Sequence, residues 1–124
     1  MRGRGDRGAA AVEFAIILPV LITIVMGIMD FGFAFFVQST AAGAAREGVR
    51  EFAINNNAGA ARNTATGLMP GGVPGVSAAV APASCTAGAT ATLTVSWTQQ
   101  SLTGFFSGLL NGPASYQARM RCGG

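Results

Sequence analysis

The sequence contains no histidine, and few of its residues are acidic. Metal sites for zinc, copper or haem iron usually need histidine, and acid–base catalysis usually needs histidine or paired carboxylates. The five acids among the 124 residues all lie within the first 51: Asp6, Glu13, Asp30, Glu47 and Glu51. We therefore expect no metal site, no cofactor, no small-molecule substrate and no catalytic residues, and we predict that the protein is not an enzyme.

Lysine is also absent, and the eight arginines are sparse. Three of them crowd the N-terminus, and the segment from residue 55 to residue 124 contains only Arg62, Arg119 and Arg121. Nucleic-acid binding normally needs a dense basic patch with interleaved aromatic side chains. We therefore do not expect a nucleic-acid partner.

Charged residues make up only 10% of the chain, whereas hydrophobic residues make up 50%. Average soluble domains carry roughly 25% charged residues. The apolar residues are concentrated between Ala9 and Gln38. A helix over Phe14–Met29 would be about 24 Å long, and extension to Val37 gives about 36 Å, compared with roughly 30 Å of bilayer hydrocarbon. The pattern predicts a transmembrane helix over about residues 14–37.

Asp30 is the one ionisable residue inside this predicted span. A charged aspartate at mid-bilayer costs on the order of 3 kcal/mol on insertion scales. We therefore place Asp30 close to the outer headgroups, either solvated there or paired with an arginine of another protein.

The arginines of residues 1–8 indicate a cytoplasmic N-terminus and an exported C-terminal part. A cleaved secretory signal is the alternative, with the small residues at 41–45 imitating a cleavage site. The apolar run, however, is longer than the 7–15 residues of a typical signal core.

Beyond the span, alanine-rich sequence with helical periodicity continues to Ile54, and three asparagines at 55–57 should end the helix. A helix over residues 9–54 would be about 69 Å long. Its exposed half should lie against the C-terminal domain or against copies of itself, because a helix of this kind needs tertiary packing.

The remaining residues, 55–124, form a predicted ectodomain. We expect a loop over 55–72, a turn at 70–75 and three strands near 76–80, 89–98 and 116–122, since apolar and polar residues alternate in these stretches. A short amphipathic helix is predicted between the second and third strands, from its apolar residues Leu102, Phe105, Phe106, Leu109 and Leu110. We expect it to cover the sheet, with docking to a partner or to the outer leaflet as the alternative. The fold class is α+β, with an antiparallel sheet.

Cys85 and Cys122 both lie on the exported side of the span, where oxidation is possible. We predict a disulfide between them. In the chain-entropy model it contributes about 3–4 kcal/mol, which suits a small domain rich in glycine and alanine.

The segment RGDRGAAAVEFAIILPVLITIVMGIMDFGFAF, followed by AAREGVREFA, resembles the N-terminal region of TadE-like proteins. These are minor pilins or pseudopilins of the bacterial tight-adherence (Flp) pilus, related to type IV pilins. The resemblance implies that a prepilin peptidase cuts between Gly8 and Ala9, which makes Glu13 the fifth residue of the mature chain. It also implies that Glu13, with Phe14, registers subunits during assembly, and that Pro19 marks a kink where the helix can unwind.

Two functional hypotheses follow. The first is a structural assembly subunit of such a pilus or of a related secretion apparatus, with prepilin peptidase, other pilin subunits and pilus-assembly membrane proteins as partners. It would cross the inner membrane once, with its C-terminus in the periplasm, and could enter a surface pilus. The alternative is an unprocessed single-pass membrane protein whose ectodomain binds or regulates an envelope partner.

Overall fold

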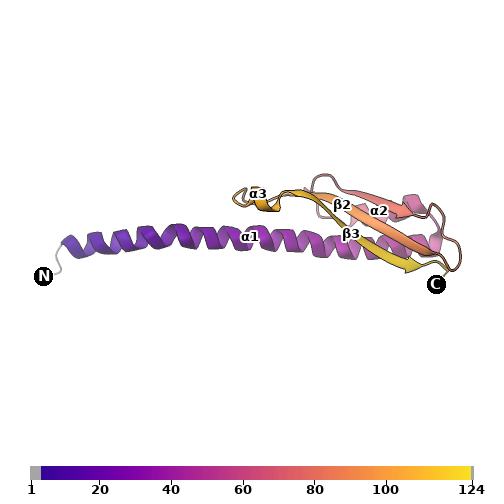
Figure 1. The fold of residues 1–124 in the computed structure, drawn as a ribbon, viewed down its shortest axis with the longest axis horizontal. Helices are drawn as coiled ribbons and strands as arrows, with labels where there is room; N and C mark the ends of the chain where they lie inside the picture. The colour runs from indigo at the N-terminus through magenta and orange to yellow at the C-terminus, as the bar shows by residue number, and fades with distance from the viewer. Residues whose placement is uncertain (1–3, 124) are drawn as a thin grey trace.

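A computed structural model of the chain describes residues 4–123 and shows one long helix with a small α+β domain packed along its C-terminal half (Figure 1). The long helix, α1, runs from Arg4 to Asn55. It ends where the asparagines predict, and Asn56 follows it with a φ of 49°, a left-handed conformation that asparagine tolerates. Residues 1–3 of the expected leader lie outside the described residues, and Arg4 to Gly8 continue the helix.

A second helix, α2, spans Ala58–Gly67, where we predicted a loop. The prediction was wrong because Asn57 acts as an N-cap: its side-chain oxygen accepts a hydrogen bond of 3.0 Å from the amide of Ala60. The segment lacks large apolar residues, but its Ala61 and Ala65 are buried. Small side chains therefore make the packed face of this helix.

The two helices are in close contact at Gly48 of α1. A Cβ atom built on Gly48 would lie 2.7 Å from Leu93 Cδ1, 2.9 Å from Ala65 Cβ and 3.0 Å from the carbonyl oxygen of Ala61. These distances are shorter than ordinary van der Waals contact. The glycine is therefore what lets α1 touch both α2 and the sheet.

The sheet contains three antiparallel strands in the order β1 (Ser77–Ala81), β2 (Thr90–Gln99) and β3 (Gly112–Arg121). The predicted alternation along the central strand is confirmed, since Ala91, Leu93, Val95 and Trp97 are buried. The same core contains Val37, Val49 and Phe52 of α1. One face of the sheet thus covers the helices, and the predicted α+β class is confirmed.

The disulfide between Cys85 and Cys122 is present, with the two Cα atoms 5.5 Å apart. It joins the loop between β1 and β2 to the residue that follows β3. The amide of Cys85 also donates a hydrogen bond of 2.5 Å to the side chain of Asn56. The end of the domain farthest from the N-terminus is therefore fastened to the end of α1.

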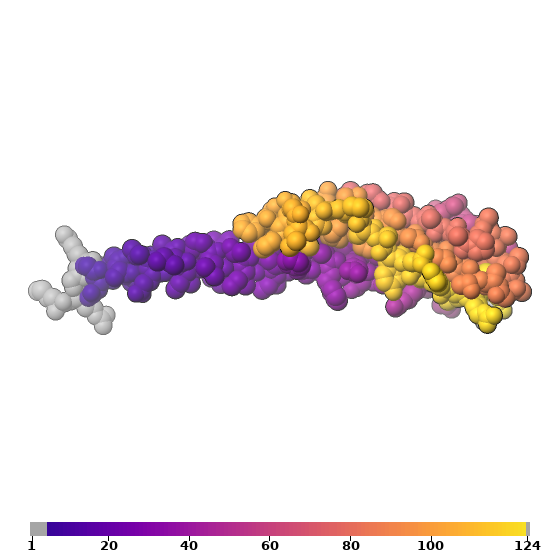
Figure 2. Space-filling view, in the orientation of Figure 1, coloured from indigo at the N-terminus to yellow at the C-terminus, as the bar shows by residue number. Residues whose placement is uncertain are grey.

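The N-terminal half of α1 projects from this domain, and every residue from Gly5 to Val25 is exposed (Figure 2). It belongs to a helix long and apolar enough to cross a membrane, and none of its most apolar window of 18 residues is buried. A core helix of a soluble protein would bury such a stretch. The bare half therefore indicates a single-pass membrane protein.

Candidate functional site

The residues singled out near the N-terminus lie together on the bare part of α1. Gly8, Ala9, Glu13 and Phe14 are all exposed. Within the described residues, Glu13 has neither a hydrogen bond nor an ion pair. Its carboxylate is therefore available to a group outside this chain, or to a new amine created by cleavage of the chain itself.

Pro19 lies inside α1, and the helix remains continuous through it. Proline has no amide proton, so it cannot donate to the carbonyl four residues earlier, at Ala15. The hydroxyl of Thr23 donates a hydrogen bond of 2.8 Å to the Pro19 carbonyl. The kink expected here stays a prediction, but the lost backbone hydrogen bond marks a weak point.

Asp30 is fully buried and is held by a loop more than seventy residues away in the sequence. Its Oδ1 accepts a hydrogen bond of 2.7 Å from the amide of Thr103, and its Oδ2 accepts bonds of 2.6 Å from the Ser101 hydroxyl and 2.8 Å from the Thr103 hydroxyl. The prediction that Asp30 is either solvated or paired with an arginine of another protein is therefore wrong. The chain's own loop satisfies the carboxylate.

The same two hydroxyl groups also organise the loop. The Ser101 hydroxyl accepts a hydrogen bond of 2.9 Å from the amide of Gly104, and the Thr103 hydroxyl accepts one of 3.2 Å from the amide of Phe105. Gly104 has a φ of 80°, which a helix cannot contain. The predicted short helix is therefore present as α3, but it has only four residues, Ser107–Leu110, and does not extend back to Leu102.

The apolar residues of this loop divide between two environments. Phe106 is partly buried on α1: its ring centroid lies 5.8 Å from that of Phe31, and its edge would meet a Cβ on Gly27 at 3.5 Å. Leu102, Phe105 and Leu109 are exposed by 55%, 57% and 73%. The expected role of covering the sheet is wrong, because the loop rests on α1 outside the hydrophobic core.

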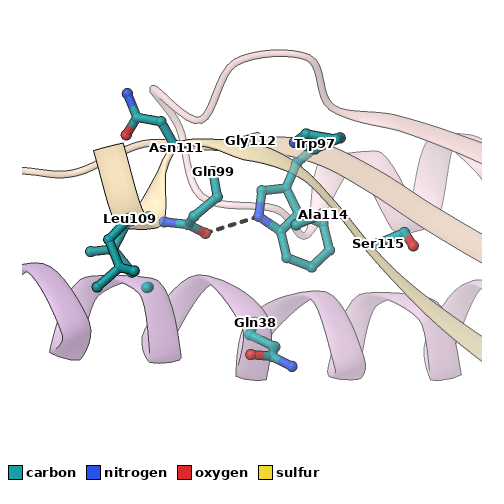
Figure 3. Close-up of a pocket in the computed structure, with 11 residues that line it drawn as sticks. Gln38, Trp97, Gln99, Leu109, Asn111, Gly112, Ala114 and Ser115 are labelled. Atoms are coloured by element: carbon teal, nitrogen blue, oxygen red, sulfur yellow. Dashed lines mark hydrogen bonds between the residues drawn. The ribbon is translucent and has the colours of Figure 1, made fainter. Parts of the chain in front are cut away.

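A groove of about 460 Å³ lies between α1, the end of β2 and the start of β3 (Figure 3). The indole nitrogen of Trp97 donates a hydrogen bond of 3.0 Å to the side-chain oxygen of Gln99 at its wall, and Gln38 faces it from α1. None of the described residues that line the groove carries an ionisable side chain. The groove can therefore hold amide or apolar groups, but it offers no acid or base for catalysis.

A protein-family match covers most of α1. The family model described as "TadE-like protein" matches residues 8–50, which is 43 of the 124 residues. This segment is similar to the TadE-like family. The match supports a protein of the tight-adherence pilus system, in agreement with the resemblance noted from the sequence. No curated protein and no solved structure matches the chain significantly.

The TadE-like segment begins at Gly8 and covers both halves of α1, the bare half and most of the half that packs on the ectodomain. Sequence reasoning placed Glu13 and Pro19 within it but missed the role of Asp30. The only available signal was an acid in an apolar helix together with a Ser-x-Thr pair followed by glycine. Nothing local to either segment relates the two.

Proposed function

We propose that the protein is a minor pilin or pseudopilin of the tight-adherence system, a structural subunit that is cut after Gly8 and assembled through α1. The observation that carries the proposal is the bare TadE-like half-helix with an exposed Glu13 near its start. In the membrane, lipid surrounds this half; in a fibre, neighbouring helices would replace the lipid.

Cleavage after Gly8 would supply the group that Glu13 lacks. The new amine of Ala9 would lie four residues before Glu13, a spacing that puts both on one face of the helix. An unpaired charge resists burial, whereas a paired one is tolerated. During assembly, the carboxylate of an incoming subunit can instead meet the amine of a subunit already in place, which would set the axial register.

Pro19 gives this half-helix a second property that assembly needs. Because the carbonyl of Ala15 lacks its usual amide donor, the turn between the two residues is easier to open than its neighbours. We infer that the helix loosens there when a subunit leaves the bilayer. Phe14 lies beside Glu13 and is exposed by 64%, so it can pack on a neighbouring helix near the charge pair.

The proposed topology follows from the same elements. The leader, residues 1–8, would remain in the cytoplasm, residues 14–37 would include the membrane span, and residues 55–124 would lie in the periplasm. The arginines of the leader favour this orientation. The disulfide fits it as well, because bacterial disulfides form and persist in the periplasm.

Substitution of Glu13 tests the assembly role. In a strain that lacks the native gene, we expect Glu13→Ala and Glu13→Gln to reach the membrane at wild-type levels but to lose surface pili, because neither can form the charge pair. Glu47→Ala is the matched control: Glu47 lies on the same helix, is exposed, and makes only a weak contact of 3.9 Å with Arg50. Wild-type numbers of pili in Glu13→Ala would refute the proposed pairing.

A further inference from the structure

The exposed apolar side of the loop around α3 lies beside the apolar surface of α1. Leu102, Phe105 and Leu109 face away from the protein, and Phe31 and Phe35 of the adjoining helix are exposed by 48% and 73%. In Figure 2 this loop extends along α1 toward the N-terminus, beyond the rest of the ectodomain. Its exposed side chains are thus continuous with the surface of the membrane-spanning half.

The rise of the helix sets how far this loop lies from the inner boundary of the bilayer. Phe106 rests on α1 between Gly27 and Phe31, and these two residues lie about 27 and 33 Å along the axis from Ala9. With Ala9 at the inner boundary of a hydrocarbon layer roughly 30 Å thick, the loop reaches the outer boundary. With Glu13 at the inner boundary, it lies about 6 Å deeper.

The distribution of charged residues also favours a position of this loop at the membrane. Between Glu13 and Arg46 the only acidic or basic residue is Asp30, and between Arg62 and Arg119 there is no Asp, Glu, Lys or Arg. Asp30 is buried, and the loop donates three hydrogen bonds to its carboxylate, so this acid is not exposed on the surface. The end of the ectodomain nearest the membrane therefore has no exposed charge to hold it in water.

We propose that the loop of residues 101–110 is a second membrane contact, immersed in the acyl-chain boundary of the outer leaflet through Leu102, Phe105 and Leu109. Asp30 acts as its tether, because it fixes the polar side of the loop on α1 while the apolar side faces lipid. Large apolar side chains at this depth are typical of interfacial anchors. The contact holds the ectodomain directly on the bilayer, and it requires only the membrane span, whatever the protein assembles with.

Photocrosslinking of the full chain in proteoliposomes of phosphatidylethanolamine and phosphatidylglycerol tests this contact. The photoreactive residue p-benzoylphenylalanine would replace Phe105 in one variant and Leu109 in a second. Both positions are exposed, so the substitutions leave the core intact. After irradiation, we expect an intact-mass increase of one phospholipid for each variant.

Two positions on α1 serve as controls. Ile17, exposed by 62% on the bare half, should give the same lipid adduct, and Ile54, exposed by 67% at the far end of the helix, should give none. Lipid adducts at positions 105 and 109 but not at 54 support the proposal. Adducts to a second copy of the chain, or no lipid adduct at 105 and 109 when Ile17 gives one, would overturn it.

Discussion

The close contact at Gly48 makes a quantitative prediction about the packing of the ectodomain on α1. In Gly48→Ala, the new methyl group would lie within 3.0 Å of Leu93, of Ala65 and of the backbone carbonyl of Ala61. Leu93 can rotate, but the carbonyl moves only if α2 moves. Such overpacking costs about 1–3 kcal/mol.

A second effect of the substitution has the opposite sign. Alanine is favoured over glycine inside a helix by about 0.8–1.0 kcal/mol. Gly43 provides the matched control, because it lies in the same helix, is exposed, and has nothing within 4 Å of its would-be Cβ. Gly43→Ala should therefore stabilise the protein by up to about 1 kcal/mol. The difference between the two variants isolates the packing cost, since helix propensity cancels.

Trp97 allows this difference to be measured directly. It is the only tryptophan and is 4% exposed in the core, so its fluorescence reports unfolding of the ectodomain. For the full chain in detergent micelles, we expect Gly48→Ala to be less stable than Gly43→Ala by about 1–3 kcal/mol, with about 4–8 °C of Tm per kcal/mol. Equal stability of the two variants, or a more stable Gly48→Ala, would refute the packing described here.

Two further predictions concern the loop tether and the disulfide. Asp30→Ala removes the acceptor of three hydrogen bonds from the loop. Amides 101–106 should therefore lose protection in hydrogen exchange, whereas the amides of β2 should keep theirs. Unchanged protection of the loop amides would contradict the tether. Cys85→Ser should lower the free energy of unfolding by about 3–4 kcal/mol in the same fluorescence assay. Labelling of both thiols in untreated periplasmic protein would show that the bridge does not form in the cell.

Elements that follow from local chemistry were predictable from the sequence. The strand over 90–99 was predictable from the strict alternation of apolar and polar residues. The end of α1 was predictable from its asparagines, because asparagine favours helix caps over helix interiors. The disulfide follows from two cysteines on one side of a membrane. Each of these inferences needs only neighbouring residues or compartment.

Elements that depend on distant contacts were not predictable in the same way. The helix α2 has no large apolar side chain, and its alanines become a packing face only because Gly48 lies opposite. The segment around α3 has a helical apolar spacing, yet Ser101 and Thr103 bind Asp30 and local amides instead of letting the helix begin earlier. Both outcomes are decided by residues far away in the chain.

The intact mass of the protein isolated from its native host tests the central claim most directly, because it separates a processed subunit from an unprocessed membrane protein. We expect the chain to lack residues 1–8 and to begin at Ala9, with the same cut reproduced by coexpression with the cognate prepilin peptidase. A mature chain that begins at Met1 or Arg2, or one cut after Gly3 or Gly5, would not have Glu13 as its fifth residue. Such a mass would contradict the proposed processing and, with it, assembly through Glu13.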